Sequence, residues 1–539
     1  MTTTQLRAAA PDPVRGGLGH PRSAPRGRSG RRPPWLLVTV AALITLITLI
    51  PLLYLGERAV ERGWAFLADE LFQARTASLI GRSLGLVAVV TAACGVLGTA
   101  LAVLVTRTSL PGRRYTSVLL ALPLAVPSYV AAYIWISEFP GLAGFWGAAI
   151  VLTVVSYPYV FLPAVAALSR LDPAQEEVAR SLGRSGVAVL FGVTLRRARA
   201  AIAAGCLLVG LYVLSDFGAV ATMRYESFTW VIYGAYRAGF NPSRAAILAL
   251  LLMVFAVALI VAESVARGRA SAYRLGAGVA RPAPLIRLGR AGRAAGSALI
   301  GVVLAAGLAF PLTVLVRWVV RSARASIDLA ALVAALTASL GYSLAAALVT
   351  TALAVPVALL AARYRGPTVG VIERATFLTH ALPGIVVAVA GVYLGARLLR
   401  PLYQTSPLLV LAYVVLFLPL AVGSIRAAVE SSPARLEEVA VSLGRSSTRA
   451  FFAVTAPMAA SGLAAGVALV FLATMKELPA TLLLHPTGTE TLATGLWRYT
   501  TVSDYGNAAP YAAALVLFAA VPTAILGRWS GRAGQIRGH

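Results

Sequence analysis

One decapeptide occurs twice in this chain, as EEVARSLGRS at residues 176–185 and as EEVAVSLGRS at residues 437–446. The two copies differ at one position, where the first has Arg180 and the second has Val441. They lie 261 positions apart in a chain of 539 residues. Such a repeat indicates two copies of one structural unit. The composition and the apolar runs of the remaining sequence indicate the class of protein that contains this repeat.

The composition is that of an integral membrane protein. Hydrophobic residues make up 59% of the chain, charged residues 12%, and the mean hydropathy is +0.80. Soluble domains have roughly 45–50% apolar and about 25% charged residues. The net charge of +27 comes almost entirely from arginines that lie between apolar runs, without the aromatic interleaving of a nucleic-acid surface. We therefore expect the lipid bilayer, and no nucleic acid, as a partner.

Apolar runs of membrane length recur along the chain. A helix needs about 20 apolar residues to cross the hydrocarbon core, where its backbone must satisfy its own hydrogen bonds. Twelve runs qualify: 35–55, 83–106, 115–137, 145–168, 201–223, 245–263, 297–317, 330–361, 375–396, 407–427, 460–483 and 509–527. The predicted fold is an all-α membrane protein of about twelve transmembrane helices, arranged as two parallel six-helix repeats.

Arginine placement predicts the topology, because cytosolic loops carry the excess of positive charge. We expect both termini on the cytosolic side of a bacterial cell membrane. The loops at 169–200 and 426–458 are then cytosolic, and 138–144 and 484–508 are external. The predicted domains are a disordered basic cytosolic tail (1–34), a first repeat (35–275), a basic cytosolic linker (276–296) and a second repeat (297–539). We expect no cleaved signal peptide, because the first apolar run has full membrane length.

Weaker matches extend the repeat in both directions. RSLGLVAVV from Arg82 is similar to YSLAAALVT from Tyr342, and ALPLAVPSYVAAY from Ala121 is similar to ALPGIVVAVAGVY from Ala381. Downstream of the decapeptides, Gly205 corresponds to Gly466 and Asp216 to Glu477. Each half thus has the same order of segments and, after six crossings, the same orientation.

The decapeptide itself has the pattern of a short helix outside the membrane. Asp172 is a suitable N-cap, Pro173 fits the first helical position, and Gln175 stands at the capping-box position. Val178 and Leu182 share a face, and Gly183 predicts the C-terminal stop. The second copy repeats these features with the following residues: Ser432, Pro433, Val439, Leu443 and Gly444. A helix lying on the lipid surface is the alternative, but such helices favour a basic polar face, whereas these begin with two acids.

The motif resembles one in a known family. Glu177-Val178-Ala179 with Gly183, and its second copy, are similar to the E-A-A-x-x-x-G motif in the cytoplasmic loop of ABC importer permeases. The family pattern continues with I-x-L-P, which residues 454–457 approach and residues 193–196 lack at the proline. The resemblance covers residues 75–530. It implies an ATPase-coupling motif formed by Glu176, Glu177, Ala179, Gly183, Glu437, Glu438, Ala440 and Gly444.

The resemblance also implies partners. Each motif would form a coupling helix that docks on a separate ATP-hydrolysing subunit, present in two copies, and an extracytoplasmic binding protein would deliver the substrate. The chain is not expected to be an enzyme, because its lone lysine, Lys476, precedes Glu477 and cannot complete a G-x-x-x-x-G-K-[ST] loop. SDFGAV from Ser215 and KELPATLLLHPTGTETLA from Lys476 resemble ferric iron importer permeases. Permeases for thiamine, polyamine or phosphonate are alternatives, as is a secondary transporter with parallel repeats.

Two acids lie within apolar runs. Asp216 is about 15 residues into its run, roughly 22 Å from the cytosolic end at about 1.5 Å per residue, and Glu477 holds the matching place. Acids at this depth usually face a bundle interior or a water-filled cavity, so both are candidates for the translocation pathway. Alternatively, they reach the outer headgroup layer or pair with arginine. No His/Cys/Asp cluster has metal-ligand spacing, so we expect neither a resident metal nor a cofactor.

Overall fold

The computed structural model describes residues 33–169, 171, 173–237, 242–268, 285–324, 328–379, 382–431 and 434–535. Over these ranges the chain is helical, and its only β-type pairing is one isolated bridge. Nine helical stretches in them are long and apolar enough to cross a membrane. The predicted all-α membrane fold is confirmed.

Most of the predicted runs coincide with continuous helical stretches. Nine of them fall on α1 (Trp35–Val60), α3 (Ala74–Arg107), α6 with α7 (Phe145–Ser156, Pro158–Ser169), α9 through α10 (Gly186–Ser215), α13 (Pro242–Gly268), α14 through α15 (Arg290–Arg324), α16 (Leu329–Arg363), α19 (Ser406–Ser431) and α21 through α22 (Ser447–Met475). The last run lies in α25 (Tyr505–Gln535).

Four runs are interrupted, two in each repeat. The runs at 201–223 and 460–483 extend past the ends of their helices at Ser215 and Met475, and the other two are divided as follows. The run at 115–137 is divided among α4 (Arg113–Leu119), η1 (Leu122–Ala125) and α5 (Ser128–Glu138), with a bend of 89° between Tyr115–Ala125 and Ser128–Glu138. The run at 375–396 falls on α17 (Pro367–Leu378) and α18 (Gly384–Arg397). Pro127 and Pro383 directly precede α5 and α18. Proline cannot donate a backbone hydrogen bond and disfavours helix at the preceding residue, so each run breaks there.

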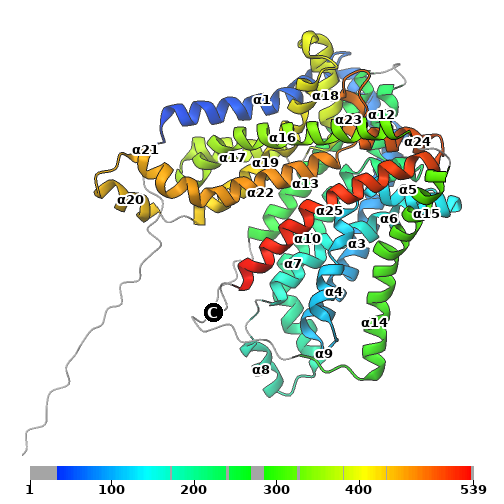
Figure 1. Cartoon of the computed structure of the whole chain (residues 1–539), viewed down its shortest axis with the longest axis vertical. Coiled ribbons are helices and arrows are strands. Elements are labelled where there is room, and N and C mark those ends of the chain that lie inside the picture. Colours follow the sequence, from blue (N-terminus) through cyan, green and yellow to red (C-terminus); the bar gives the residue numbers. More distant parts are fainter. Residues whose placement is uncertain are drawn as a thin grey trace, which may run out of the picture.

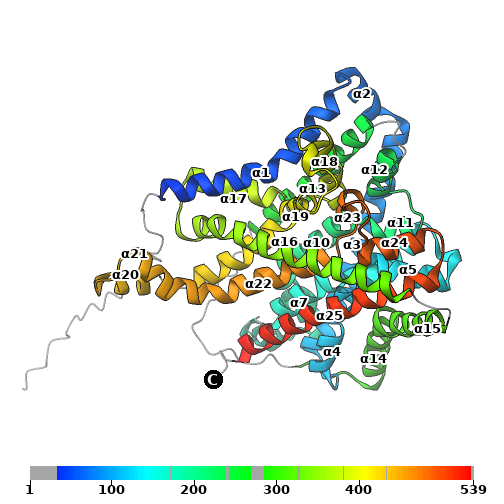
Figure 2. The same cartoon turned by 45° about the horizontal axis from the view of Figure 1, so that its top comes forward.

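The helices form two arms that diverge from a common end (Figure 1). One arm contains α3, α7 and α10, which pack on one another and carry α8 (Ala174–Ser181) at the tip. The other contains α16, α19 and α22, which pack likewise and carry α20 (Ala434–Ser442). The arms meet around α5, α18, α23 (Pro479–Leu484) and α24 (Leu492–Thr501). Figure 2 shows α20 and α21 at the far end of the second arm.

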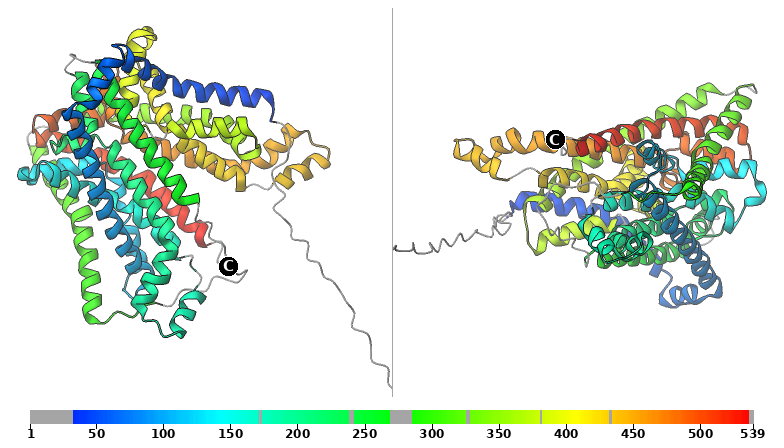
Figure 3. Two further views of the ribbon diagram at one scale, coloured as in Figure 1. Left: turned by 180° about the vertical axis from the view of Figure 1, so that it is seen from behind. Right: turned by 90° about the horizontal axis from the view of Figure 1, so that it is seen from below.

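The first membrane helix of each repeat crosses to the other arm. Helix α1 packs on α13 of its own repeat and on α16, α17 and α18 of the other, and Thr45 Oγ1 lies 2.9 Å from Thr376 Oγ1. In return, α15 (Phe310–Arg324) packs on α5 and α25, and Trp318 Nε1 donates to Glu138 Oε1 at 3.1 Å. Figure 3 shows α1 lying along the second-repeat arm. Each repeat therefore packs its first membrane helix against helices of the other repeat.

The structure corrects the register of the upstream repeat matches. Ser83 Oγ accepts from Phe228 N at 3.0 Å, and the same contact in the second repeat joins Ser339 Oγ to Leu492 N at 2.8 Å. Ser83 thus corresponds to Ser339, whereas the match of Arg82 with Tyr342 places it opposite Ser343.

The proline match requires the same correction. Pro127 (φ −59°, ψ 141°) and Pro383 (φ −59°, ψ 142°) are equivalent, so the alignment of Ala121 with Ala381 is also four residues out of register. A slip of four residues is about one helical turn and leaves the same face apolar, which is why the sequence pattern did not reveal it.

The downstream match of Gly205 with Gly466 holds in sequence position but not in the contact made. A Cβ on Gly205 would lie 2.7 Å from the carbonyl oxygen of Tyr159, whereas the nearest atom to one on Gly466 is the side-chain Oγ of Ser424 at 3.0 Å. The comparable close approach to a backbone in the second repeat is at Gly462, where a Cβ would lie 2.8 Å from the carbonyl oxygen of Ser424.

Candidate functional site

Both decapeptides form a helix followed by the same turn. Gly183 (φ +78°) and Gly444 (φ +86°) have left-handed backbones. The N–H of Gly183 donates to Arg180 O at 2.9 Å, and that of Arg184 donates to Ala179 O at 3.2 Å. This pair of bonds is the Schellman motif that glycine favours at helix ends. The second copy makes the corresponding bonds at 3.0 and 3.2 Å, so the predicted C-terminal stops are confirmed.

Of the residues predicted at the N-cap and the first helical position of the two short helices, the structure describes Pro173. The predicted caps Asp172 and Ser432, together with Pro433, lie outside the described residues. Pro173 has helical dihedrals, and its carbonyl accepts from the N–H groups of Glu176 and Glu177, each at 3.0 Å. The helix begins at Ala174 with Pro173 as its N-cap, one position earlier in the helix than predicted.

The last residue of each decapeptide starts the next helix, a role that the sequence analysis missed. Ser185 Oγ accepts from Ala188 N at 3.3 Å, and Ser446 Oγ accepts from Arg449 N at 3.4 Å. Serine is a strong N-cap, so the signal was present in the GRS triplet. These helices continue through π-helical turns, η3 (Leu190–Leu195) and η7 (Phe451–Thr455), into α10 and α22.

The first glutamate of each decapeptide holds its loop against the arm. Glu176 Oε1 lies 3.2 Å from Arg107 Nη1, at the end of α3, and accepts from Thr194 Oγ1 at 2.9 Å. In the second repeat, Glu437 Oε1 accepts from Arg363 Nη2 at 2.8 Å and from Thr455 Oγ1.

We call these two groups the arginine–glutamate–threonine triads. Their arginines and threonines were not predicted as site residues. The available signal was an arginine ending an apolar run at the same place in both halves.

The second glutamate and the apolar residues of each loop face outward. Glu177 and Glu438 are exposed, whereas Ala179 is buried and Ala440 half-buried. Three apolar side chains per loop are largely exposed at equivalent positions: Val178 (59%), Leu182 (76%) and Phe191 (66%) in the first, and Val439 (54%), Leu443 (78%) and Phe452 (66%) in the second. We call these six residues the apolar tip faces. Exposed large apolar side chains on a short helix, such as Val178 with Leu182 and Val439 with Leu443, are candidates for an interaction site.

Asp216 and Glu477 lie at equivalent helix breaks. Helix α10 ends at Ser215 and α22 at Met475. The continuous stretch from Gly186 to Ser215 has 30 residues and spans roughly 45 Å. The expected distance of roughly 22 Å is measured from the start of the apolar run at residue 201, and the helix begins 15 residues earlier, at Gly186. The additional length separates Asp216 from the decapeptide, and the depth of Asp216 in the membrane stays a prediction.

Both acids cap short helices. Asp216 Oδ1 accepts from Ala219 N at 2.9 Å, and Oδ2 accepts from the Ser128 hydroxyl. Glu477 Oε2 accepts from Ala480 N at 2.9 Å and from Thr481 N at 3.1 Å. These contacts start α11 (Gly218–Thr222) and α23. Neither acid has an arginine partner among the ion pairs of the described residues.

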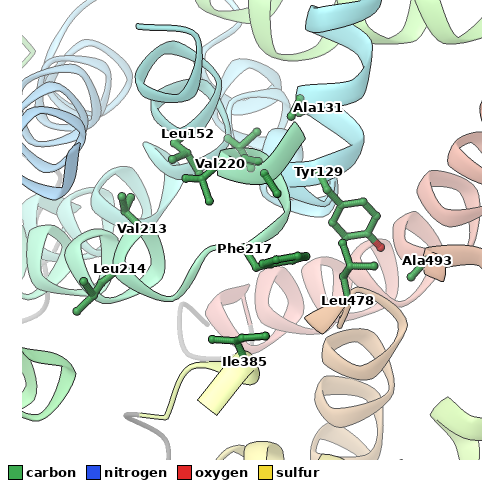
Figure 4. Close-up of a cluster of buried hydrophobic side chains, with 14 of the residues drawn as sticks. Tyr129, Ala131, Leu152, Val213, Leu214, Phe217, Val220, Ile385, Leu478 and Ala493 are labelled. Atoms are coloured by element: carbon green, nitrogen blue, oxygen red, sulfur yellow. The ribbon is translucent and has the colours of Figure 1, made fainter. Parts of the chain in front are cut away.

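The residues after the two acids meet between the repeats. Figure 4 shows Phe217 beside Tyr129 and Leu478, with Ile385 and Ala493 close by. All five are buried in one apolar cluster, which we call the central plug. Lys476, in the second repeat, donates from Nζ to Leu124 O of the broken first-repeat span at 2.9 Å.

The axis that relates the repeats runs next to this plug. The contacts of Ser83 and Ser339 make Phe228 equivalent to Leu492, and therefore Tyr233 equivalent to Trp497. The rings of Tyr233 and Trp497 lie 6.2 Å apart at 85°. Equivalent residues that touch must lie near the axis relating their repeats.

The protein has two related helical arms, the central plug between them, and matching apolar tip faces at their ends. This arrangement is that of a two-repeat membrane transport protein. The family model described as "Binding-protein-dependent transport system inner membrane component" matches residues 95–270 and 354–532. The chain belongs to this family, the permeases of ABC importers.

Three relatives illustrate the family. The Fe(3+)-transport system permease protein FbpB 2 of Haemophilus influenzae is 35% identical over 93% of this chain and 99% of its own length. The sulfate transport system permease protein CysW of Escherichia coli is 27% identical over 35% of this chain and 70% of its own length. The molybdate/tungstate transport system permease protein WtpB of Pyrococcus furiosus is 29% identical over 34% of this chain and 76% of its own length. All three are transport permeases.

Proposed function

We propose that this chain is the membrane-spanning permease of an ATP-binding-cassette importer, and that it translocates ferric iron delivered by an extracytoplasmic binding protein. A separate ATPase subunit drives it by docking on the apolar tip faces. The repeats follow the division at residues 35–275 and 297–539, with both termini and both tip faces in the cytosol. The single observation that carries the proposal is the pair of tip faces, whose three apolar side chains are exposed at the same positions in both repeats.

Some residues of the coupling motif anchor the loop to its arm, and others are exposed for docking of the ATPase. Glu176 and Glu437 hold each loop to its arm, and Gly183 and Gly444 fix the turn at its end. Ala179 and Ala440 keep the inner face of the short helix small. Glu177 and Glu438, with the tip faces, are exposed and available to the ATPase. Two matching surfaces favour two copies of that subunit.

Ferric iron is the cargo that the relatives favour. The permease of Haemophilus influenzae is named for Fe(3+) transport and matches nearly the whole of both chains, whereas the sulfate and molybdate permeases match about a third of this chain. Thiamine, polyamine and phosphonate remain the alternatives to be tested.

Asp216 and Glu477 would act as supports of the pathway wall. Their carboxylates already accept backbone N–H groups of α11 and α23. Those helices hold Phe217 and Leu478 in the central plug. The acids would thus set the position of the constriction through which the substrate passes.

The cargo is tested by deleting the gene and measuring ⁵⁵Fe(III) uptake and growth under iron, thiamine, polyamine or phosphonate limitation. We expect an iron-specific defect that the intact gene restores. Normal iron uptake with starvation for another of these nutrients would overturn the iron assignment while leaving the importer assignment in place.

The docking of the ATPase is tested by copurification from detergent. We expect Leu182→Asp combined with Leu443→Asp to lose the ATPase subunit, because a charge replaces the apolar contact. Val502→Asp is the matched control, since Val502 is similarly exposed (71%) but lies outside both coupling loops, in the turn after α24. Equal retention of the ATPase by the double variant and the control would contradict the proposal.

A further inference from the structure

The two coupling loops are not equivalent in how they are held. The first triad is buried: the side chains of Arg107 and Glu176 are 3% and 5% exposed. In the second triad, the side chains of Arg363 and Glu437 are 20% and 28% exposed. Arg107 also donates from Nη2 to Leu168 O at 2.8 Å, which ties the end of α3 to the end of α7.

The connection between the repeats covers the first triad. Ile286 N donates to Arg107 O at 2.8 Å, and Ser109 N donates to Ile286 O at 3.2 Å. These bonds form a parallel bridge between Thr108 and Ile286. Residues 285–289 then lead directly into α14, the first membrane helix of the second repeat. We call residues 285–289 the strap.

Ile286 and the one variable letter of the decapeptide meet at the same cavity. The residues that line a small cavity beside the first triad include Arg107, Glu176, Arg180 and Ile286. Arg180 is the position at which the second copy has Val441, and Val441 is 43% exposed. The single difference between the decapeptides thus lies where the strap covers the first loop.

We infer that Arg107, Glu176 and Ile286 are positioning residues that clamp the first coupling loop to the second repeat through the strap, so that the two loops contribute unequally to coupling. This inference rests on the proposed function. A buried ion pair tolerates the loss of one partner poorly, because the other charge is left without compensation. An ion pair that is a quarter exposed keeps access to water. Motion of the first loop is therefore passed rigidly to α3 and, through the strap, to α14.

The experiment compares Glu176→Gln with Glu437→Gln in the complete transporter in proteoliposomes. We expect Glu176→Gln to lower ATP-driven uptake at least tenfold while ATP hydrolysis continues, and Glu437→Gln to lower uptake less than threefold. Ile286→Pro removes the N–H that donates to Arg107 O and should reproduce the Glu176→Gln phenotype. Arg287→Pro is its matched control, because no backbone hydrogen bond from Arg287 N is found in this part of the chain.

A second measurement tests the strap without relying on transport. In a background lacking Cys94 and Cys206, the pair Thr108→Cys and Ile286→Cys should form a disulfide on mild oxidation of membranes. Absence of that cross-link, or equal losses of uptake in the two glutamine variants, would overturn the inference. If the unmodified transporter shows no ATP-driven uptake, the proposed function is wrong. The disulfide between residues 108 and 286 would still test whether the strap lies against the end of α3.

Discussion

The left-handed turns at Gly183 and Gly444 allow a graded test of coupling. An ideal Cβ at either position meets nothing within 4 Å, so a substitution there causes no clash. Its cost comes only from φ values of +78° and +86°. A left-handed backbone costs an L-residue roughly 1–2 kcal/mol, and β-branched residues are the least tolerant. We therefore expect about 1 kcal/mol for Ala, about 2 kcal/mol for Val, and less for Asn, which adopts this conformation more readily.

The free-energy cost at the turn predicts how far ATP-driven uptake falls in each variant. Since about 1.4 kcal/mol is a factor of ten, Val at Gly183 shifts the turn equilibrium about 30-fold and Ala about fivefold. We expect ATP-driven uptake to fall in the order Gly, Asn, Ala, Val. The amount of protein in the membrane should stay constant, because the turn lies outside the buried core.

Gly186 provides the internal control for this series. It begins α9 without a positive φ and also has nothing within 4 Å of an ideal Cβ. Gly186→Val should leave uptake within about twofold of the unmodified protein. The reasoning would be refuted if Gly183→Val and Gly186→Val transported equally well, since strain at the turn would then have no functional consequence.

The other predictions concern topology, the two acids and the lysine. In intact cells of a strain lacking Cys94 and Cys206, Ser185→Cys should resist a membrane-impermeant thiol reagent; labelling from outside would reverse the topology. Asp216→Asn should keep the helix cap and most of the uptake, whereas Asp216→Ala should lose about 1–3 kcal/mol of stability through unpaired buried donors, measured as a lower melting temperature in detergent. If the Asn variant is stable but inactive, the negative charge itself serves transport. Lys476→Met should weaken the closed plug and raise ATP hydrolysis in the absence of substrate; unchanged basal hydrolysis would contradict this.

The sequence alone was sufficient for the membrane class, the repeats and the short helix that each decapeptide forms. Apolar runs of about 20 residues force helices because the bilayer offers no water to the backbone, and eight of the twelve runs lie within one continuous helical stretch. The turns at Gly183 and Gly444 were also predictable, because glycine is the residue that accepts a positive φ without cost. These features depend on local chemistry, which the sequence displays directly.

Other features depend on which helices pack together, and only the tertiary structure decided them. The sequence match placed Arg82 opposite Tyr342, four residues from the true register, because a shift of about one turn preserves the apolar face of a helix. The roles of Arg107 and Thr194 became visible only when α3 and α10 brought them to Glu176.

The exchange of α1 and α15 between the arms, and the capping of α11 and α23 by Asp216 and Glu477, were likewise decided by packing. Hydrophobic periodicity specifies that a helix face is buried, but it does not specify against which partner. The sequence therefore determined the elements and their chemistry, and the tertiary structure determined which of those groups meet.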